Sequence, residues 1–191
     1  MVEYEKRTFE QSFEIRDGEQ GGHIISGYAV VFDSKSRNMG FIETIDPHAF
    51  ESVDMSEVLC LYNHEFSNIL SRTDAQTLKL NVDKRGLAFT SELPQTTLGN
   101  DVYINISNGN VRGCSFGFDV DSDEWDENDQ GISTRRILKF GHLFEVSLCP
   151  VPAYPETSVQ AQRSFEQYRR SRQVKERLNL WLDLTEKLEK E

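Results

Sequence analysis

The sequence RGCSFGF, residues 112–118, decides between two fold classes because it places a serine between two glycines. The pattern Gly-x-Ser-x-Gly forms the nucleophile elbow of α/β hydrolases only when a strand precedes the serine and a helix follows it. After Ser115, however, Phe116, Phe118 and Val120 alternate with small or polar residues, which is the period of a β-strand. An α/β-hydrolase fold is therefore excluded, and Ser115 is placed within a strand.

The stretches around this strand predict further β-structure. Residues 9–15 and 23–32 lie on either side of a glycine-rich turn and are expected to form a hairpin. Residues 77–93 alternate apolar and polar side chains around a turn at 83–86, which predicts a second hairpin. Most of the chain is thus expected to consist of antiparallel strands.

Two helices are expected within this β-rich part. Asp46 and Pro47 supply an N-cap and a proline at the first helical position, which predicts a short helix over 48–53. Residues 96–109 begin with threonines, space apolar residues at helical intervals and end at Gly109, so they predict a second helix. The expected fold class is therefore α+β.

The composition of the chain changes near residue 157. From Thr157 to Glu191 there is no glycine or proline, and the first half of this segment is basic. Apolar residues recur there at helical spacing, at Val174, Leu178, Trp181, Leu182 and Leu188. We expect one domain over residues 1–157 and a helical, partly basic tail over 158–191, which packs either on its own domain or on another molecule.

Charge and hydropathy limit the possible partners. The formal net charge of −11 disfavours a nucleic-acid partner, because binding phosphates requires clustered Lys and Arg. No apolar run reaches the length of a membrane span, and the polar first residues lack the apolar core of a signal peptide. Protein partners and a cytoplasmic location are therefore expected.

Neither a metal ion nor an organic cofactor is expected. The cysteines are odd in number and lack the spacing of a zinc site or a disulfide framework; they are Cys60, Cys114 and Cys149. The acidic run 119–129 begins like a calcium loop, but Glu124 and Gln130 stand where that loop requires a glycine and a glutamate. We interpret the run as a solvated connection of a hairpin.

Three side chains have the chemistry that acyl transfer requires. A serine hydroxyl needs a histidine to accept its proton, and the histidine needs an acid to orient it and stabilise its charge. Ser115, His64 and Glu145 supply these groups. Taken singly, His64 could equally cap a turn and Glu145 could face solvent; a buried Glu145 would need a partner, since burying an unpaired ion costs roughly several kcal/mol.

Four stretches, in this order, resemble the blocks of the tailed-phage prohead protease family, the serine proteases of capsid maturation. They are GYAVVFDS (27–34), LYNHEFSNILSRT (61–73), GCSFGF (113–118) and FEVSLCPVPAYPET (144–157). Together they extend the resemblance over roughly Arg7 to Thr157. The family is similar in turn to the herpesvirus assemblins.

The resemblance implies an assemblin-like fold, a mostly antiparallel β-barrel surrounded by helices, and a catalytic triad at His64, Ser115 and Glu145. It implies a serine endopeptidase that works inside the assembling prohead in the host cytoplasm. Its substrates would be scaffold segments, extensions of the major capsid protein and the chain itself. A homodimer is compatible with the resemblance, whereas nucleic acid, membrane, metal and organic cofactor have no place in it.

The oxyanion donors do not follow from the resemblance. Assemblins carry arginines after the third triad member, whereas no arginine follows Glu145 closely here. Backbone NH groups near Phe116 or in the turn 150–154 are the candidates, with Arg72 and Arg112 as weaker ones.

Three alternatives stay open. The fold could carry an inactive structural or scaffolding module of the shell, because fold alone does not imply function. One of the cysteines could act as the nucleophile with His64. Finally, His142 could replace His64 or serve as the third member, although strand alternation places it on the face opposite Glu145.

Overall fold

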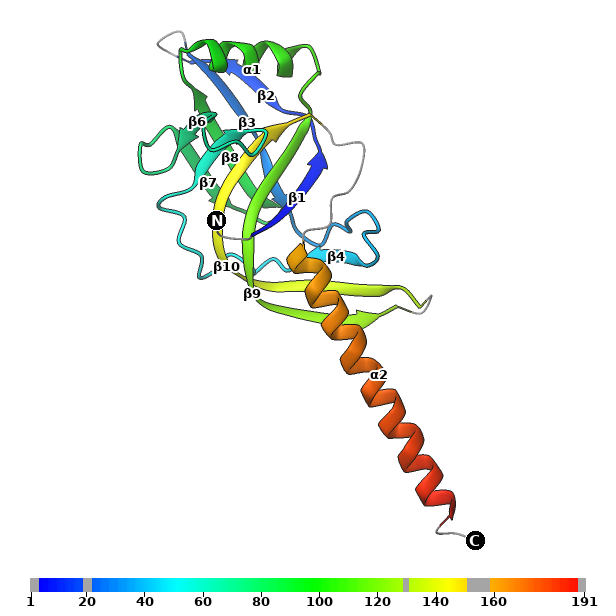
Figure 1. Cartoon of the computed structure of the whole chain (residues 1–191). Coiled ribbons are helices and arrows are strands. Elements are labelled where there is room, and N and C mark those ends of the chain that lie inside the picture. The colour runs from blue at the N-terminus through cyan, green and yellow to red at the C-terminus, as the bar shows by residue number, and fades with distance from the viewer. Residues whose placement is uncertain (1–3, 19–21, 129–130, 151–158, 189–191) are drawn as a thin grey trace. The chain divides into compact units, whose positions relative to one another are not determined.

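The computed structural model describes residues 4–18, 22–128, 131–150 and 159–188 (Figure 1). The chain divides into two compact units, Met1–Glu156 and Thr157–Glu191, which we describe separately. The described part of the second unit is the helix α2 (Val159–Leu188). The expected mixed α+β fold, rich in strands, is confirmed.

The first unit combines strands with one described helix. Its elements in chain order are β1 (Glu5–Glu10), β2 (Glu14–Asp17), β3 (His23–Val31), β4 (Ile42–Ile45), β5 (Leu59–Tyr62), β6 (Ile69–Arg72), β7 (Leu78–Val82), β8 (Gly86–Leu93), α1 (Thr97–Ser107), β9 (Gly113–Glu127) and β10 (Ser133–Cys149).

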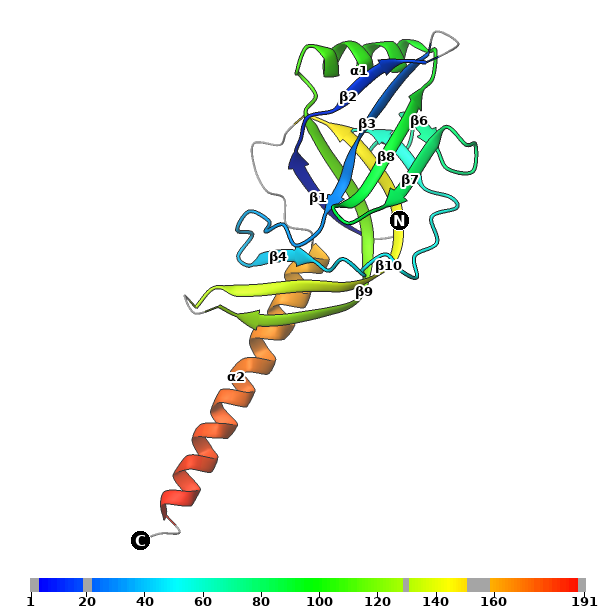
Figure 2. The same cartoon turned by 180° about the vertical axis from the view of Figure 1, so that it is seen from behind.

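These strands form two sheets. The six-stranded sheet has the order β1-β9-β10-β5-β6, and β4 also pairs with β10. The pairs of β10 with β4 and β5 are parallel, whereas β9 and β1 are antiparallel to their neighbours. The four-stranded sheet has the antiparallel order β2-β3-β8-β7, and α1 lies at one end of it in both views (Figures 1 and 2).

The core is built on an aromatic cluster from β9 and β10. Phe116 and Phe118 stack with their ring centroids 4.7 Å apart, and Phe140 packs edge-on against them at 6.1 and 5.0 Å. Because side chains alternate along a strand, Ser115 and Gly117 point to the other face of the same sheet. That face is buried as well, since the whole of β9 from Gly113 to Phe118 is buried.

The two sheets do not close into one barrel through the strands that the structure describes, which differs from the barrel that the family resemblance implies. Just after the end of β1, the side-chain amide of Gln11 makes the two hydrogen bonds that a neighbouring strand would make with β3. It donates to the Tyr28 carbonyl (2.7 Å) and accepts from the Tyr28 NH (2.9 Å). On the other side, a hydroxyl contact of 2.7 Å links Ser71 on β6 to Ser91 on β8. Side chains thus join the sheets at two places where a barrel would need backbone ladders.

Several local predictions are confirmed. The predicted second helix is α1, in which Thr96 is the N-cap and accepts a hydrogen bond from the Gly99 NH (3.2 Å). Gly109 follows the helix with a φ of 72°, a left-handed conformation that glycine adopts without strain. The predicted hairpin over 77–93 is the pair β7 and β8.

Other local predictions are wrong. Residues 48–53 form successive turns, closed by bonds such as Ala49 NH to the Asp46 carbonyl (3.0 Å), and not a helix. The predicted first hairpin is the pair β2 and β3, but Phe9 belongs to β1, which pairs with β9 instead.

The acidic run is a strand and not a solvated connection. Its residues up to Glu127 continue β9 and pair with β10. Cations of β10 neutralise the acids: Arg135 contacts Asp123 at 2.6 Å and Lys139 contacts Asp121 at 3.6 Å. These cross-strand partners lie more than ten residues away in sequence, so local charge density alone could not reveal them.

A buried ionic network ties the edge strand β1 to the centre of its sheet. Arg7 contacts Glu5 and Glu43 at 2.6 and 2.7 Å, and Arg135 contacts the same two carboxylates at 2.8 and 3.0 Å. Burial raises the pKa of Glu5, but the hydrogen bonds and charges of Arg135 and Arg7 outweigh it and leave that pKa lowered. Glu5 therefore stays charged, and the network of Glu5, Glu43, Arg7 and Arg135 holds β1 and β4 against β10.

Replacing Arg135 by Met should unfold the protein more easily. The change leaves Glu5 and Glu43 with Arg7 as their one cation in the network and removes the cation bound to Asp123, and removing one partner of a buried ion pair costs about 3–5 kcal/mol. Urea unfolding followed by circular dichroism measures the loss. Arg136→Met is the matched control, because Arg136 is the next residue, is 41% exposed and makes surface ion pairs; its loss should be within about 1 kcal/mol. Equal losses for the two variants would show that the buried network stabilises the fold no more than surface ion pairs do.

Candidate active site

The structure pairs two of the predicted site residues. Glu145 lies near the C-terminal end of β10 with a fully buried side chain, and it accepts a hydrogen bond from His64 Nδ1 at 2.8 Å. His64 lies in the turn that follows β5, two residues after the strand ends at Tyr62. Strand β5 runs parallel to β10, with Leu59 opposite Glu145. Burying a carboxylate requires a partner, and His64 is that partner.

A left-handed turn presents the histidine. Asn63 and His64 have φ angles of 56° and 61°, a conformation that non-glycine residues adopt at some cost and that is concentrated at functional sites. Two bonds to β10 hold this turn: Asn63 NH donates to the Leu148 carbonyl (3.0 Å), and His64 NH donates to Ser147 Oγ (3.2 Å).

Ser147 is a site residue that the sequence analysis missed. Its hydroxyl donates to Glu145 Oε2 at 2.5 Å while accepting from the His64 backbone NH. One buried hydroxyl thus fixes both members of the pair. The signal was present in the sequence, because Ser147 is two residues after Glu145 and residues two apart on a strand share a face.

Ser115 lies on the same face of the sheet as this pair. In the register of β9 and β10, Ser115 is opposite Ser147 and Gly117 is opposite Glu145, and residues directly opposite each other share a face. Its hydroxyl is fully buried and makes no hydrogen bond within the described part of the chain, and none joins it to His64. A buried hydroxyl without a partner is rare and is a sign of a functional group.

Gly117 makes room for the carboxylate. A Cβ at this position would collide with Glu145 Oε1 (2.5 Å) and with the ring of Tyr4, so only glycine fits. Tyr4 packs on Phe144 with ring centroids 5.3 Å apart. Burial and, to a smaller extent, the charge of Glu145 raise the pKa of Tyr4 to about 12, so its side chain is a neutral phenol beside the acid. Tyr4 is the second residue of the site, after Ser147, that the sequence analysis missed.

The weaker candidates are occupied elsewhere or poorly suited. Arg72 pairs with Asp74, and Arg112 pairs with Glu10 at 3.3 Å, so neither contacts the His64–Glu145 pair. Most of the turn 150–154 proposed as an oxyanion donor lies outside the described residues. His142 is exposed and bound by Asp119 at 2.8 Å.

The other two histidines are also occupied. His48 contacts Asp46 at 3.0 Å, and His23 stacks on Tyr103 with ring centroids 3.5 Å apart.

The three thiols are buried, which disfavours a cysteine nucleophile. Burial raises the pKa of Cys60 and of Cys149 to about 12, and it raises that of Cys114 as well. The reactive thiolate is therefore scarce at neutral pH.

The described residues contain no group of three or more His, Cys, Asp or Glu side chains able to hold a metal ion. No helix in this part of the chain is long and apolar enough to cross a membrane.

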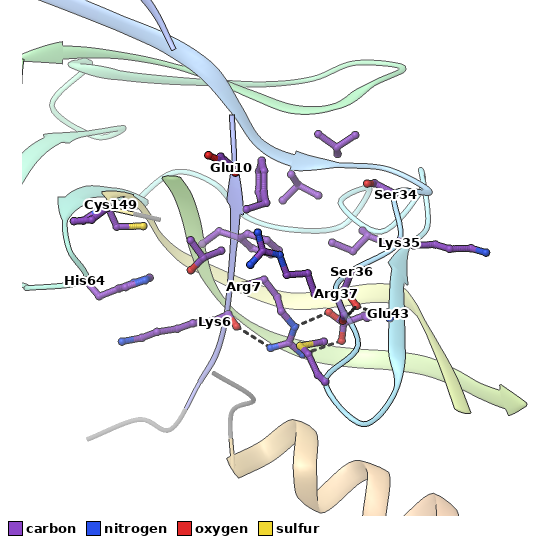
Figure 3. Close-up of a pocket in the computed structure, with 18 of the residues that line it drawn as sticks. Lys6, Arg7, Glu10, Ser34, Lys35, Ser36, Arg37, Glu43, His64 and Cys149 are labelled. Atoms are coloured by element: carbon purple, nitrogen blue, oxygen red, sulfur yellow. Dashed lines mark hydrogen bonds and ion pairs between the residues drawn. The ribbon is translucent and has the colours of Figure 1, made fainter. Parts of the chain in front are cut away.

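A pocket of about 580 Å³ borders the site. It surrounds β1 and is lined on one side by Asn63, His64 and Cys149. Figure 3 shows His64 and Cys149 on one side of the strand that carries Lys6 and Arg7.

Comparison with known proteins identifies relatives of the chain. A family model described as caudovirus prohead serine protease matches residues 11–171. The prohead protease of Enterobacteria phage HK97 is 30% identical over 156 residues, which cover 78% of this chain and 64% of that protein. The chain therefore spans less than two thirds of this relative.

A solved structure shares the fold. The bacteriophage T4 capsid assembly protease is similar with a TM-score of 0.52 at 14% identity, over 75% of this chain and 95% of that one. This likeness extends to the fold alone.

Replacing Ser147 by Ala should loosen the His64–Glu145 pair. Glu145 Oε2 loses its donor, and a hydrogen bond to a charged group contributes about 1.5–3 kcal/mol to the free energy of unfolding. We expect a loss of that size and faster exchange of the His64 Nδ1 proton in NMR spectra. Ser91→Ala, which removes an equally buried hydroxyl bonded to neutral Ser71, is the control and should leave that proton unchanged. An unchanged Nδ1 proton in Ser147→Ala would contradict the positioning role of Ser147.

Proposed function

This chain belongs to the caudovirus prohead serine proteases, and on that premise we propose that it is a serine endopeptidase of phage capsid maturation. One observation carries the proposal: the half-buried His64 pairs with the buried Glu145 on the sheet face that also carries Ser115, whose hydroxyl has no hydrogen-bond partner among the described residues. These are the three groups that acyl transfer requires, and they come from three separate segments of the chain.

In the proposed reaction Ser115 attacks the scissile carbonyl carbon and His64 takes the hydroxyl proton. Glu145 holds Nδ1, which leaves Nε2 as the base and stabilises the imidazolium as it forms. The tetrahedral intermediate collapses to an acyl-serine as His64 gives the proton to the leaving amine. Water, deprotonated by the same nitrogen, then releases the second product and restores Ser115.

The proposed nucleophile must become accessible before this reaction can begin. The hydroxyl of Ser115 is fully buried, so a peptide carbonyl cannot reach it in the conformation described. Catalytic hydrogen bonds that are absent in a free enzyme commonly form in the substrate complex. We therefore infer that substrate binding opens the site and brings Ser115 into hydrogen-bonding distance of His64.

We propose scaffold segments, extensions of the major capsid protein and the chain itself as substrates, processed inside the assembling prohead of the infected cell. An inactive module of the shell is disfavoured, because a chain without catalysis has no need to keep the costly buried carboxylate and its histidine.

Co-expression with the phage's own capsid and scaffold proteins tests the proposed function. Ser115→Ala should lower cleavage by at least about ten-thousandfold, and Glu145→Gln by a similar factor because the histidine loses its orienting charge. Intact masses of the products measure cleavage. Cys114→Ala is the control, since it changes the adjacent buried residue on the opposite face of β9 and should retain cleavage. Cleavage retained in Ser115→Ala would exclude the serine mechanism.

For the tail, we propose a separate role in entering the shell. Helix α2 exposes apolar side chains that recur at helical spacing, at Val174, Leu178, Trp181 and Leu182. Such a surface suits pairing with another helix, and scaffold helices are the partner we propose.

Deleting residues 157–191 should lower the number of protease chains per prohead without lowering peptidase activity in solution. Leu178→Ala with Trp181→Ala should reproduce the loss, whereas Asn179→Ala on the same helix should not. Quantitative mass spectrometry of purified proheads measures the content. Normal incorporation of the deleted chain would refute this role.

A further inference from the structure

The pocket around β1 is a cationic site within an acidic protein. Lys6, Lys35 and Arg37 line it, and none of them forms an ion pair with the residues that the structure describes. The pocket's two carboxylates are neutralised, since Glu43 binds Arg7 at 2.7 Å and Glu10 binds Arg112 at 3.3 Å. The free charge of the pocket is therefore positive, although the whole chain has a net charge of −11.

The same pocket contains an unpaired strand edge. One edge of β1 pairs with β9, and of the strands described here none pairs with the other edge. The Lys6 carbonyl already accepts from Arg7 Nη1 (2.8 Å), which leaves Arg7–Glu10 as the open part. An open edge binds extended peptides, because their backbone NH and carbonyl groups complete the ladder.

The cations stand on both sides of this edge. Lys6 is opposite Gly117 and Thr8 is opposite Ser115, so Lys6 shares the face of the proposed active site. Figure 3 shows Lys6 on the same side of the strand as His64, whereas Arg37 reaches toward the strand from the other side. Lys35 points away from the strand in this view.

We propose that the pocket binds an acidic, extended peptide segment along the open edge of β1, with a carboxylate on Lys6 beside His64. Successive side chains of a strand point to opposite sides, so the next residue of the bound segment faces Arg37. This inference rests on the proposed function, because it makes the bound segment the substrate. It names the substrate class as peptides with acidic residues next to the cleaved bond.

A nucleic acid is the less suitable occupant. Its phosphates would also meet Lys6 and Arg37, but the acidic remainder of the chain repels a polyanion. A short peptide that carries one or two carboxylates meets the pocket without that penalty.

Cleavage of a mixed peptide library, read by mass spectrometry, identifies the bonds that are cut. The best substrate is then compared with its Glu→Gln counterpart, and the readout is the ratio of the two kcat/KM values. In wild type the acidic peptide should be favoured by at least about tenfold. Lys6→Glu and Arg37→Glu should each lower that ratio about tenfold or more, and Lys84→Glu, an exposed lysine of the β7–β8 turn, should leave it unchanged.

A binding measurement separates this inference from the proposed function. The full chain with Ser115→Ala is titrated with the fluorescent acidic peptide, and single-stranded DNA serves as the competitor. Lys6-dependent binding without any cleavage by wild type would support the surface and refute the peptidase. Equal cleavage of acidic and neutral peptides would refute the surface while the peptidase stands, and displacement by DNA at peptide-like concentrations would refute a peptide site.

Discussion

The antiparallel pairing of β9 with β10 is the constraint on which the rest of the structure depends. Its register places Ser115 opposite Ser147 and Gly117 opposite Glu145, so the site exists only in this alignment. A slip of one residue would turn these polar groups into the aromatic core and place Phe116 on the face that carries Glu145 and Ser147. The phenylalanines on one face thus secure the chemistry on the other, because their burial selects the register.

Two buried carboxylates in the sheet of β9 and β10 each need a partner that offsets the cost of their burial. Glu145 and Glu43 are both buried carboxylates of the same sheet, and each is stabilised by a partner that is distant in sequence. For Glu43 the partners are the arginines Arg7 and Arg135, whose permanent charges suit a structural contact that holds β1 in place. For Glu145 the partner is a histidine, the one side chain whose charge changes near neutral pH and which can therefore pass protons.

Sequence reasoning predicted the elements whose signals are local. Alternation predicted the β7–β8 hairpin, and threonine with Gly109 marked the ends of α1. Two of the residues predicted to form the site, Ser115 and Glu145, lie on one sheet face, and His64 reaches Glu145 from a turn, although the sequence alone left Glu145 open between burial and exposure. Ser147 and Tyr4 were missed because their roles arise from contacts across strands. The acidic strand was misjudged for the same reason, since its stability comes from cations on β10.

If Ser115 is the nucleophile, as proposed, the burial of its hydroxyl affects the rate law. When only a small fraction of molecules is open, the apparent affinity for substrate falls by that same fraction. At low substrate concentration the turnover falls with it, whereas at saturating concentration binding pulls the population open and turnover recovers. In the proposed peptidase, a closed site would make cleavage slow when substrate is dilute and fast in a shell that is crowded with substrate.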